Sequence, residues 1–180
     1  PPPEPPAPVR FVRFGIDGGI LLVQHAGLAG ALRLWRLGRS VKLEAALDLP
    51  APVTCVARGV RSPFMFLGTE CATVLAVDAA ACQLREVARA PGAPGPDERG
   101  ADSAQCAALC ALEINPAAPK RLLLGERGGG LFVLECGVAG TVPICEFGRA
   151  ESRVLSCACW CGGASGGAWR LVAAGFDDGA

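Results

Sequence analysis

The sequence lacks several residue types, and each shortage excludes a class of function. Its 180 residues contain no tyrosine, one histidine and one methionine, and 17 basic side chains balance 17 acidic ones. Because the net charge is zero, the chain has no basic excess to attract nucleic acid or acidic lipid, so neither is an expected partner. The single histidine, His25, would have to be the base in any Ser-His or Cys-His pair, which argues against an enzyme.

Signals for secretion and for membrane insertion are also missing. The N-terminus is proline-rich rather than basic, and polar or charged residues interrupt the longest apolar runs within about ten residues. Cysteine makes up about 6% of the residues, below the roughly 8–10% of a short secreted disulfide scaffold. The sequence contains no CxxC pair, the usual spacing of zinc ligands within one segment. We therefore expect a reduced, cytoplasmic protein with no transmembrane segment, no metal and no cofactor.

Two segments are expected to lie outside the folded core. Residues 1–8, PPPEPPAP, predict an extended polyproline-type leader, and a PxxP ligand for an aromatic groove is the alternative. Residues 90–105, APGAPGPDERGADSAQ, combine proline, glycine and charge and predict a flexible surface insertion. The whole sequence is 51% hydrophobic, so that residues 9–180 can form a globular domain.

An internal repeat indicates the fold class. The apolar segments are short and end in Gly or Asp-Gly turns, which is typical of strands. Hairpins align at a small residue in four places: Ala26, Gly68, Gly125 and Gly175. By subtraction these positions lie 42, 57 and 50 residues apart, which fits WD40 blades of about 40–45 residues with insertions. We therefore predict an all-β fold of WD40-like β-propeller blades.

The remaining apolar segments complete three blades and the first half of a fourth. Innermost strands are expected at 9–14, 53–59, 109–115 and 154–160, and outer strands at 41–49, 82–88 and 142–148. Three and a half to four blades make an incomplete ring with unpaired sheet edges, so we expect part of a longer propeller protein. On alanine and leucine content alone, 104–112 could instead form a short helix.

The order of motifs along the blades resembles the lethal giant larvae and tomosyn family. Leu67-Gly68-Thr69-Glu70 gives the LGTE hairpin of one blade, the insertion follows, and ALEINPAAPKRLLLG at 111–125 gives the NPxxP pattern of the next. The chain departs from the pattern at Cys71-Ala72, where the turn is expected to hold glycine. Val77-Asp78 and Leu134-Glu135 stand where an ideal repeat has Trp-Asp.

This resemblance implies a non-catalytic scaffold that regulates exocytosis and cell polarity. Its implied partners are SNARE or syntaxin proteins or polarity proteins, which would bring a cytoplasmic protein to the plasma membrane. Family members carry two fused propellers, and some add a SNARE-like helix; neither a second propeller nor a heptad helix occurs in this sequence. The alternative is a generic WD40 scaffold of an unrelated intracellular complex. The identity of the partner and the loops that bind it stay open.

Few residues point to a particular site. The polar insertion offers Asp97, Glu98 and Arg99 as partner-binding residues on grounds of exposure. Residues 163–167 match GxSxG, but a hydrolase needs a later Asp and His, which the sequence lacks in that order. The cysteines of CACWC, residues 157, 159 and 161, alternate along an expected strand, and we expect small buried side chains. A metal or redox role for them is the alternative.

Overall fold

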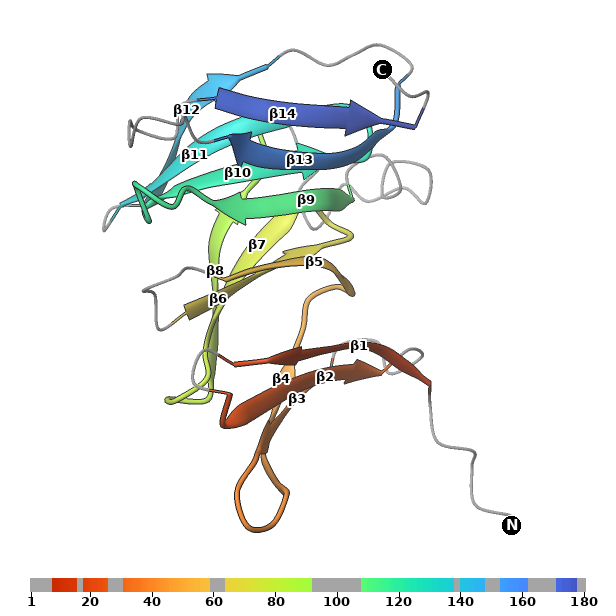
Figure 1. Ribbon diagram of the computed structural model, residues 1–180, viewed down its shortest axis with the longest axis vertical. Coiled ribbons are helices and arrows are strands. Elements are labelled where there is room, and N and C mark those ends of the chain that lie inside the picture. The colour runs from red at the N-terminus through yellow and green to blue at the C-terminus, as the bar shows by residue number, and fades with distance from the viewer. Residues whose placement is uncertain are drawn as a thin grey trace.

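The fold consists of strands alone over the residues that the structure describes. The computed structural model describes residues 8–15, 18–25, 31–58, 64–91, 108–137, 140–147, 153–161 and 171–177. These ranges form 14 strands in four antiparallel sheets, and they contain no helix (Figure 1). Neighbours within each sheet are also neighbours in sequence, so that every connection is a hairpin.

Three of the sheets have four strands and the last has two. Blade 1 comprises β1 (Val9–Phe14), β2 (Ile20–His25), β3 (Ala31–Arg36) and β4 (Lys42–Asp48). Blade 2 comprises β5 (Val53–Arg58), β6 (Phe64–Thr69), β7 (Thr73–Asp78) and β8 (Gln83–Arg89). Blade 3 comprises β9 (Leu109–Ile114), β10 (Arg121–Glu126), β11 (Leu131–Gly137) and β12 (Gly140–Glu146). Sheet 4 comprises β13 (Leu155–Cys161) and β14 (Leu171–Phe176).

The predicted all-β architecture is confirmed, including the position of each inner strand. The four expected inner strands are β1, β5, β9 and β13, with ends within one residue of the prediction. The helix considered for 104–112 is wrong over 109–112, because this segment pairs with β10 as β9. Residues 1–7 of the leader and residues 92–105 of the insertion lie outside the described residues.

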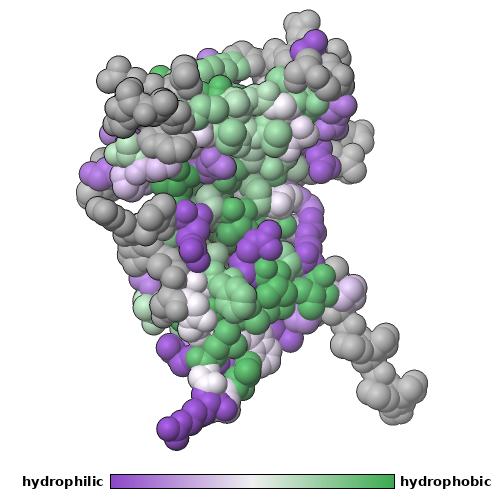
Figure 2. Space-filling model, viewed as in Figure 1, coloured by the Kyte–Doolittle hydropathy of each residue, from purple (hydrophilic) through white to green (hydrophobic). Residues whose placement is uncertain are grey.

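The blades stack face to face, and the core lies between them rather than within any one sheet. Figure 1 shows the chain rising from blade 1 at the bottom to sheet 4 at the top. One apolar cluster joins blades 1 and 2, a second joins blades 2 and 3, and a third joins blade 3 to sheet 4. Apolar side chains also reach the surface over blade 1 (Figure 2).

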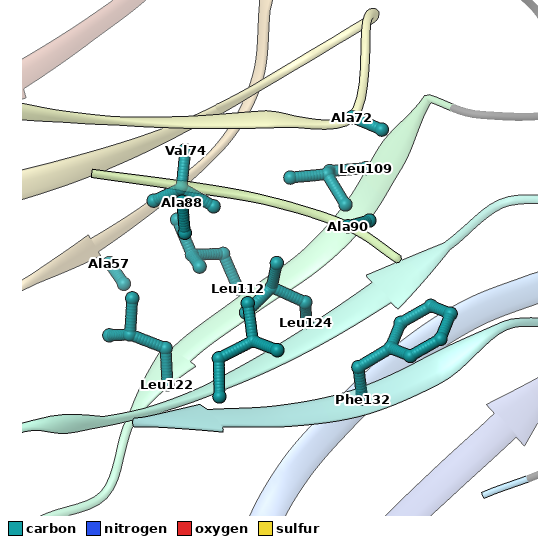
Figure 3. Packing of buried hydrophobic residues seen from close by; sticks show 11 residues of the cluster. Ala57, Ala72, Val74, Ala88, Ala90, Leu109, Leu112, Leu122, Leu124 and Phe132 are labelled. Atoms are coloured by element: carbon teal, nitrogen blue, oxygen red, sulfur yellow. The ribbon is translucent and has the colours of Figure 1, made fainter. Parts of the chain in front are cut away.

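Small and large side chains meet in the cluster between blades 2 and 3 (Figure 3). Blade 2 contributes mostly alanine, at positions 57, 72, 88 and 90. Blade 3 contributes leucines and Phe132, which is fully buried. Because one face is small and the other large, the two sheets can approach closely.

Each inner strand carries the same irregularity near its start. One residue is skipped in the pairing with the second strand, as in a β-bulge. The bulged residues are Arg10, Thr54, Cys110 and Ser156. Three of these side chains donate to a glycine carbonyl: Thr54 to Gly68 (3.1 Å), Cys110 to Gly125 (3.4 Å) and Ser156 to Gly175 (3.0 Å). The bulge therefore recurs opposite the glycine of the sequence repeat in these three sheets.

In blade 1 the strand register corrects the sequence alignment by two residues. Phe11 pairs with Gln24 in the same way that Cys55 pairs with Gly68, so Gln24 takes the position predicted for Ala26. Gln24 is buried, and its Oε1 accepts a hydrogen bond of 3.1 Å from the N–H of Val53. The alignment was wrong because it required a small residue here, whereas blade 1 uses a buried amide that bonds to the next blade.

The glycines lie where the next blade comes closest. A Cβ on Gly68 would lie 2.4 Å from Cys55 Sγ and 3.2 Å from Leu109 Cβ. A Cβ on Gly125 would lie 2.4 Å from Leu155 Cδ2. Leu109 and Leu155 each begin the inner strand of the following blade. We call this packing of an inner-strand leucine onto the preceding blade's glycine the glycine–leucine contact.

Replacing the glycine of this contact should separate two blades. We expect Gly125→Ala to lower the free energy of unfolding by about 1–3 kcal/mol, because the added methyl overpacks the core against Leu155. Urea unfolding followed by tryptophan fluorescence measures the loss. Gly38→Ala is the matched control, since the nearest atom to its Cβ would be Ser40 O at 3.9 Å. Equal midpoints for the two variants would contradict the contact.

Candidate functional site

A cleft lies between blades 2 and 3 at the ends of their inner strands. Its volume is about 810 Å³. The end of β5 forms one wall, and the end of β9 with the following turn forms the other. The lining residues are Val56, Ala57, Arg58, Leu112, Glu113, Ile114, Asn115, Pro116, Ala117 and Pro119. Most of these are apolar, so the cleft can hold an apolar segment between two charged side chains.

The NPxxP motif builds the wall on the side of blade 3. Asn115 Oδ1 accepts hydrogen bonds from the N–H groups of Ala117 (2.9 Å) and Ala118 (3.0 Å). The N–H of Asn115 also donates to the carbonyl of Arg121 at 2.9 Å, which closes the turn between β9 and β10. Pro116 restricts the backbone further. The turn is thus rigid before any partner arrives.

The two charged residues of the cleft are connected to the neighbouring blades. Arg58 is exposed, and its Nη1 donates to the carbonyl of Gly15 in blade 1 at 3.5 Å. Glu113 Oε2 accepts a hydrogen bond of 3.1 Å from the N–H of Trp160 in sheet 4. The cleft therefore offers one cation and one anion among mostly apolar residues, which suits recognition of a peptide rather than of a highly charged ligand.

The LGTE motif has a structural role. Gly68 makes the glycine–leucine contact, and Thr69 Oγ1 accepts hydrogen bonds from the N–H groups of Cys71 (3.3 Å) and Thr73 (3.2 Å). Glu70 forms an ion pair with Arg10 of blade 1. The motif thus closes its own hairpin and connects blade 2 to both neighbours.

The sequence prediction and the cleft share few residues. Asp97, Glu98 and Arg99 lie outside the described residues. Asn115, Pro116 and Pro119 entered the sequence analysis as family markers and prove to line the cleft. Arg58 and Glu113 were missed, because they come from different blades and no spacing along the chain relates them.

The expectation that the CACWC cysteines are buried is wrong. Cys157 and Cys159 are exposed, and Cys161 is half-buried. Their alternation along one face of β13 is confirmed, but Ala158 and Trp160 on the opposite face pack against blade 3. The cysteines therefore lie on the face of sheet 4 that points away from the stack. Within the described ranges, no group of three or more His, Cys, Asp or Glu residues could hold a metal ion.

Two cysteines of the inner strands differ from these. Burial raises the pKa of the Cys55 thiol to about 12, against an ordinary value of 9.0. Burial likewise raises the pKa of Cys110 to about 11. Cys110 Sγ lies 3.1 Å from the carbonyl oxygen of Leu155 and 3.4 Å from that of Gly125, so its single S–H is within reach of both carbonyls and links blade 3 to sheet 4. Both thiols are protonated at neutral pH and act as structural donors or packing groups.

Alkylation rates should separate the two kinds of cysteine. With iodoacetamide at pH 8, we expect Cys157 to be modified at least tenfold faster than Cys55 in the folded protein, because a pKa near 12 leaves almost no thiolate. Peptide mass spectrometry over time gives both rates. In denaturant the difference should vanish. A folded protein in which Cys55 reacts as fast as Cys157 would contradict the packing.

The same shift makes the stability sensitive to alkali. The pKa of Cys55 is higher in the folded than in the unfolded chain. The protonated thiol therefore contributes fully to the free energy of unfolding below pH 9, and this contribution is lost as the pH rises towards 12. Unfolding midpoints of wild type should fall over that window. Cys55→Ala should flatten part of the decline.

No helix among the described residues is long and apolar enough to cross a membrane.

Comparison with solved structures identifies the class of the fold as a WD40-type β-propeller. A crystal structure of RRP9 WD40 repeats matches 86% of this chain and 42% of that chain at 12% identity, with a TM-score of 0.58. A structure of U3-55K matches 86% and 43% at 12% identity, with a TM-score of 0.59. A structure of the mitotic checkpoint complex matches 93% and 44% at 13% identity, with a TM-score of 0.62.

These matches establish the fold alone, because the identities are low. The chain spans less than half of the length of the solved chains that it matches. No protein-family profile matches the sequence, and no curated protein does. The WD40 part of the sequence resemblance is therefore confirmed, whereas the comparisons do not extend to the lethal giant larvae and tomosyn family.

Proposed function

We propose that this chain is a non-catalytic protein-binding scaffold whose partner inserts a peptide segment into the cleft between blades 2 and 3. The cleft carries the proposal, because it combines an apolar floor, a rigid turn and two opposite charges in about 810 Å³. The hydroxyls of Thr54 and Ser156 on the inner strands support a non-catalytic role, since both donate to glycine carbonyls of their own sheets.

The finer proposal is a regulator of exocytosis or cell polarity like those of the lethal giant larvae and tomosyn family. Support comes from the sequence order of the LGTE hairpin, the insertion and the NPxxP turn. The proposed partners are SNARE or syntaxin proteins or polarity proteins, met in the cytoplasm and at the plasma membrane. The second candidate is a WD40 scaffold of another complex, favoured by the likeness to structures from assemblies as different as RRP9 and the mitotic checkpoint complex.

The domain organisation follows from the same proposal. Residues 1–8 form a leader, residues 9–180 form the propeller part, and the insertion at about 90–105 provides a second contact surface. In the insertion, Asp97, Glu98 and Arg99 would bind the partner.

Binding to purified syntaxin tests the proposed partner and the proposed cleft separately. We expect the cytoplasmic region of syntaxin to bind the wild-type chain in titration calorimetry, with no enzymatic turnover. Arg58→Glu should weaken binding about tenfold, or about 1.4 kcal/mol, because it reverses the cation at the cleft. Deletion of 91–103 should weaken binding and leave the unfolding midpoint unchanged.

Arg39→Glu is the matched control, because it makes the same charge change at an exposed turn of blade 1. It should bind like wild type. If syntaxin does not bind the wild-type chain, the family proposal is wrong. If syntaxin binds and Arg58→Glu has no more effect than Arg39→Glu, the partner stands and the cleft is the wrong site.

A further inference from the structure

A second cavity lies on blade 2, farther from the inner strand than the cleft. Its volume is about 230 Å³, and residues of β6, β7 and β8 line it; we call it the outer cavity. One row of cross-strand partners runs between the two cavities: Ala57, Phe66, Ala76 and Arg85. The first of these lines the cleft, and the last two line the outer cavity. Because directly paired residues share a face of a sheet, both cavities lie along one face of blade 2.

This face of blade 2 is the one that packs against blade 3. Ala57 belongs to the apolar cluster between the two blades and faces the leucines of blade 3 (Figure 3), and Phe66 packs against that cluster. At the outer end, the charge of Arg85 acts on Cys136 of β11. Burial raises the pKa of this thiol, and a hydrogen bond with Thr141 and the Arg85 cation oppose the rise. The cleft and the outer cavity are thus two parts of one junction, between blades that are neighbours within the chain.

The cations at this junction have hydrogen-bond donors to spare. Within the described ranges, none of Arg58, Arg85 and Lys120 forms an ion pair. Arg58 donates one long bond, of 3.5 Å, to the carbonyl of Gly15. The guanidinium carbon of Arg85 lies 5.5 Å from the centre of the Phe64 ring, a cation–π contact that uses none of its N–H donors. A guanidinium has five such donors in a planar fork that fits a carboxylate.

The carboxylates at the same junction are already bonded to the backbone of the chain. In the outer cavity, Asp78 Oδ1 accepts hydrogen bonds from the N–H groups of Ala80 and Ala81, both at 3.0 Å. In the cleft, Glu113 Oε2 accepts its bond from the N–H of Trp160. Backbone donors therefore offset these two negative charges, whereas the guanidinium groups keep unused donors. This asymmetry makes the junction complementary to an anionic ligand.

We propose that the peptide bound by the cleft is acidic and extended, and that it continues to the outer cavity, where one of its carboxylates binds Arg85. The proposal rests on the proposed function, since it places a peptide in the cleft. Strands β5 to β8 are consecutive neighbours in the sheet and span three strand spacings of about 4.8 Å, or roughly 14 Å. An extended peptide covers this distance in about four residues at about 3.3 Å each. The expected ligand therefore has an apolar residue for the cleft and an Asp or Glu about four positions away.

Selection from a random peptide library tests the chemistry of the ligand directly. A phage-displayed library of random peptides of about 12 residues, long enough to reach both cavities, is panned on the wild-type chain. We expect the enriched peptides to be acidic and to carry the pattern above. In fluorescence polarisation, a synthetic enriched peptide should bind Arg85→Glu about tenfold more weakly than wild type, because the cation that meets its carboxylate is reversed. Exchanging that acidic residue of the peptide for lysine should restore binding to Arg85→Glu.

Arg39→Glu is again the matched control, because it makes the same charge change at an exposed turn of blade 1 and should bind the peptide like wild type. Restored binding by the lysine peptide shows that Arg85→Glu is folded. If no enriched peptide is weakened by Arg58→Glu, the proposed function of the cleft is wrong, and the present proposal with it. If Arg58→Glu weakens binding but Arg85→Glu does not, the cleft stands and its extension to Arg85 is wrong. Enriched peptides that are neutral or basic, or a lysine exchange that restores nothing, would likewise overturn the acidic ligand.

Discussion

The close approach of each inner strand to the preceding blade is the constraint on which the structure depends. Leu109 and Leu155 pack so near to Gly68 and Gly125 that the second strand has no room for a side chain. The bulge at the start of each inner strand places a polar side chain where it satisfies the same glycine's carbonyl. Backbone proximity and hydrogen bonding are therefore satisfied at one point, and loss of the glycine would disturb both.

This constraint explains why the core lies between sheets. A four-stranded blade alone has two faces and no interior, so each blade is stable only when its neighbours cover it. Alanines on blade 2 face leucines on blade 3, and this size difference keeps the two sheets close at the glycine. Blade 1 meets blade 2 differently, through the amide of Gln24 and the N–H of Val53. A buried amide can thus take the place of the glycine at a blade junction, provided that the amide is hydrogen-bonded.

The fold could largely be predicted because strand alternation and turn glycines are local signals. The equivalence of Gln24 to the repeat glycines could not be predicted, because an alignment by residue size cannot recognise a buried amide that replaces a glycine. The departure at Ala72 is informative: its φ is +56°, and the equivalent Gly129 has a φ of +87°. The expectation of glycine in that turn was therefore physically sound, and blade 2 holds an alanine in a conformation that favours glycine.

The candidate site was harder to predict for a geometric reason. A propeller places functional groups by bringing the ends of successive inner strands together, and these ends are separated in sequence by a whole blade. Arg58 and Glu113 follow this pattern, each connected to a different neighbour and both facing one cleft. The CACWC cysteines show the same limit, because alternation gives the two faces of β13 but not which face the adjacent blade covers. The faces of a blade acquire their roles only from the order of blades in the stack, and binding surfaces in this fold are properties of junctions rather than of motifs.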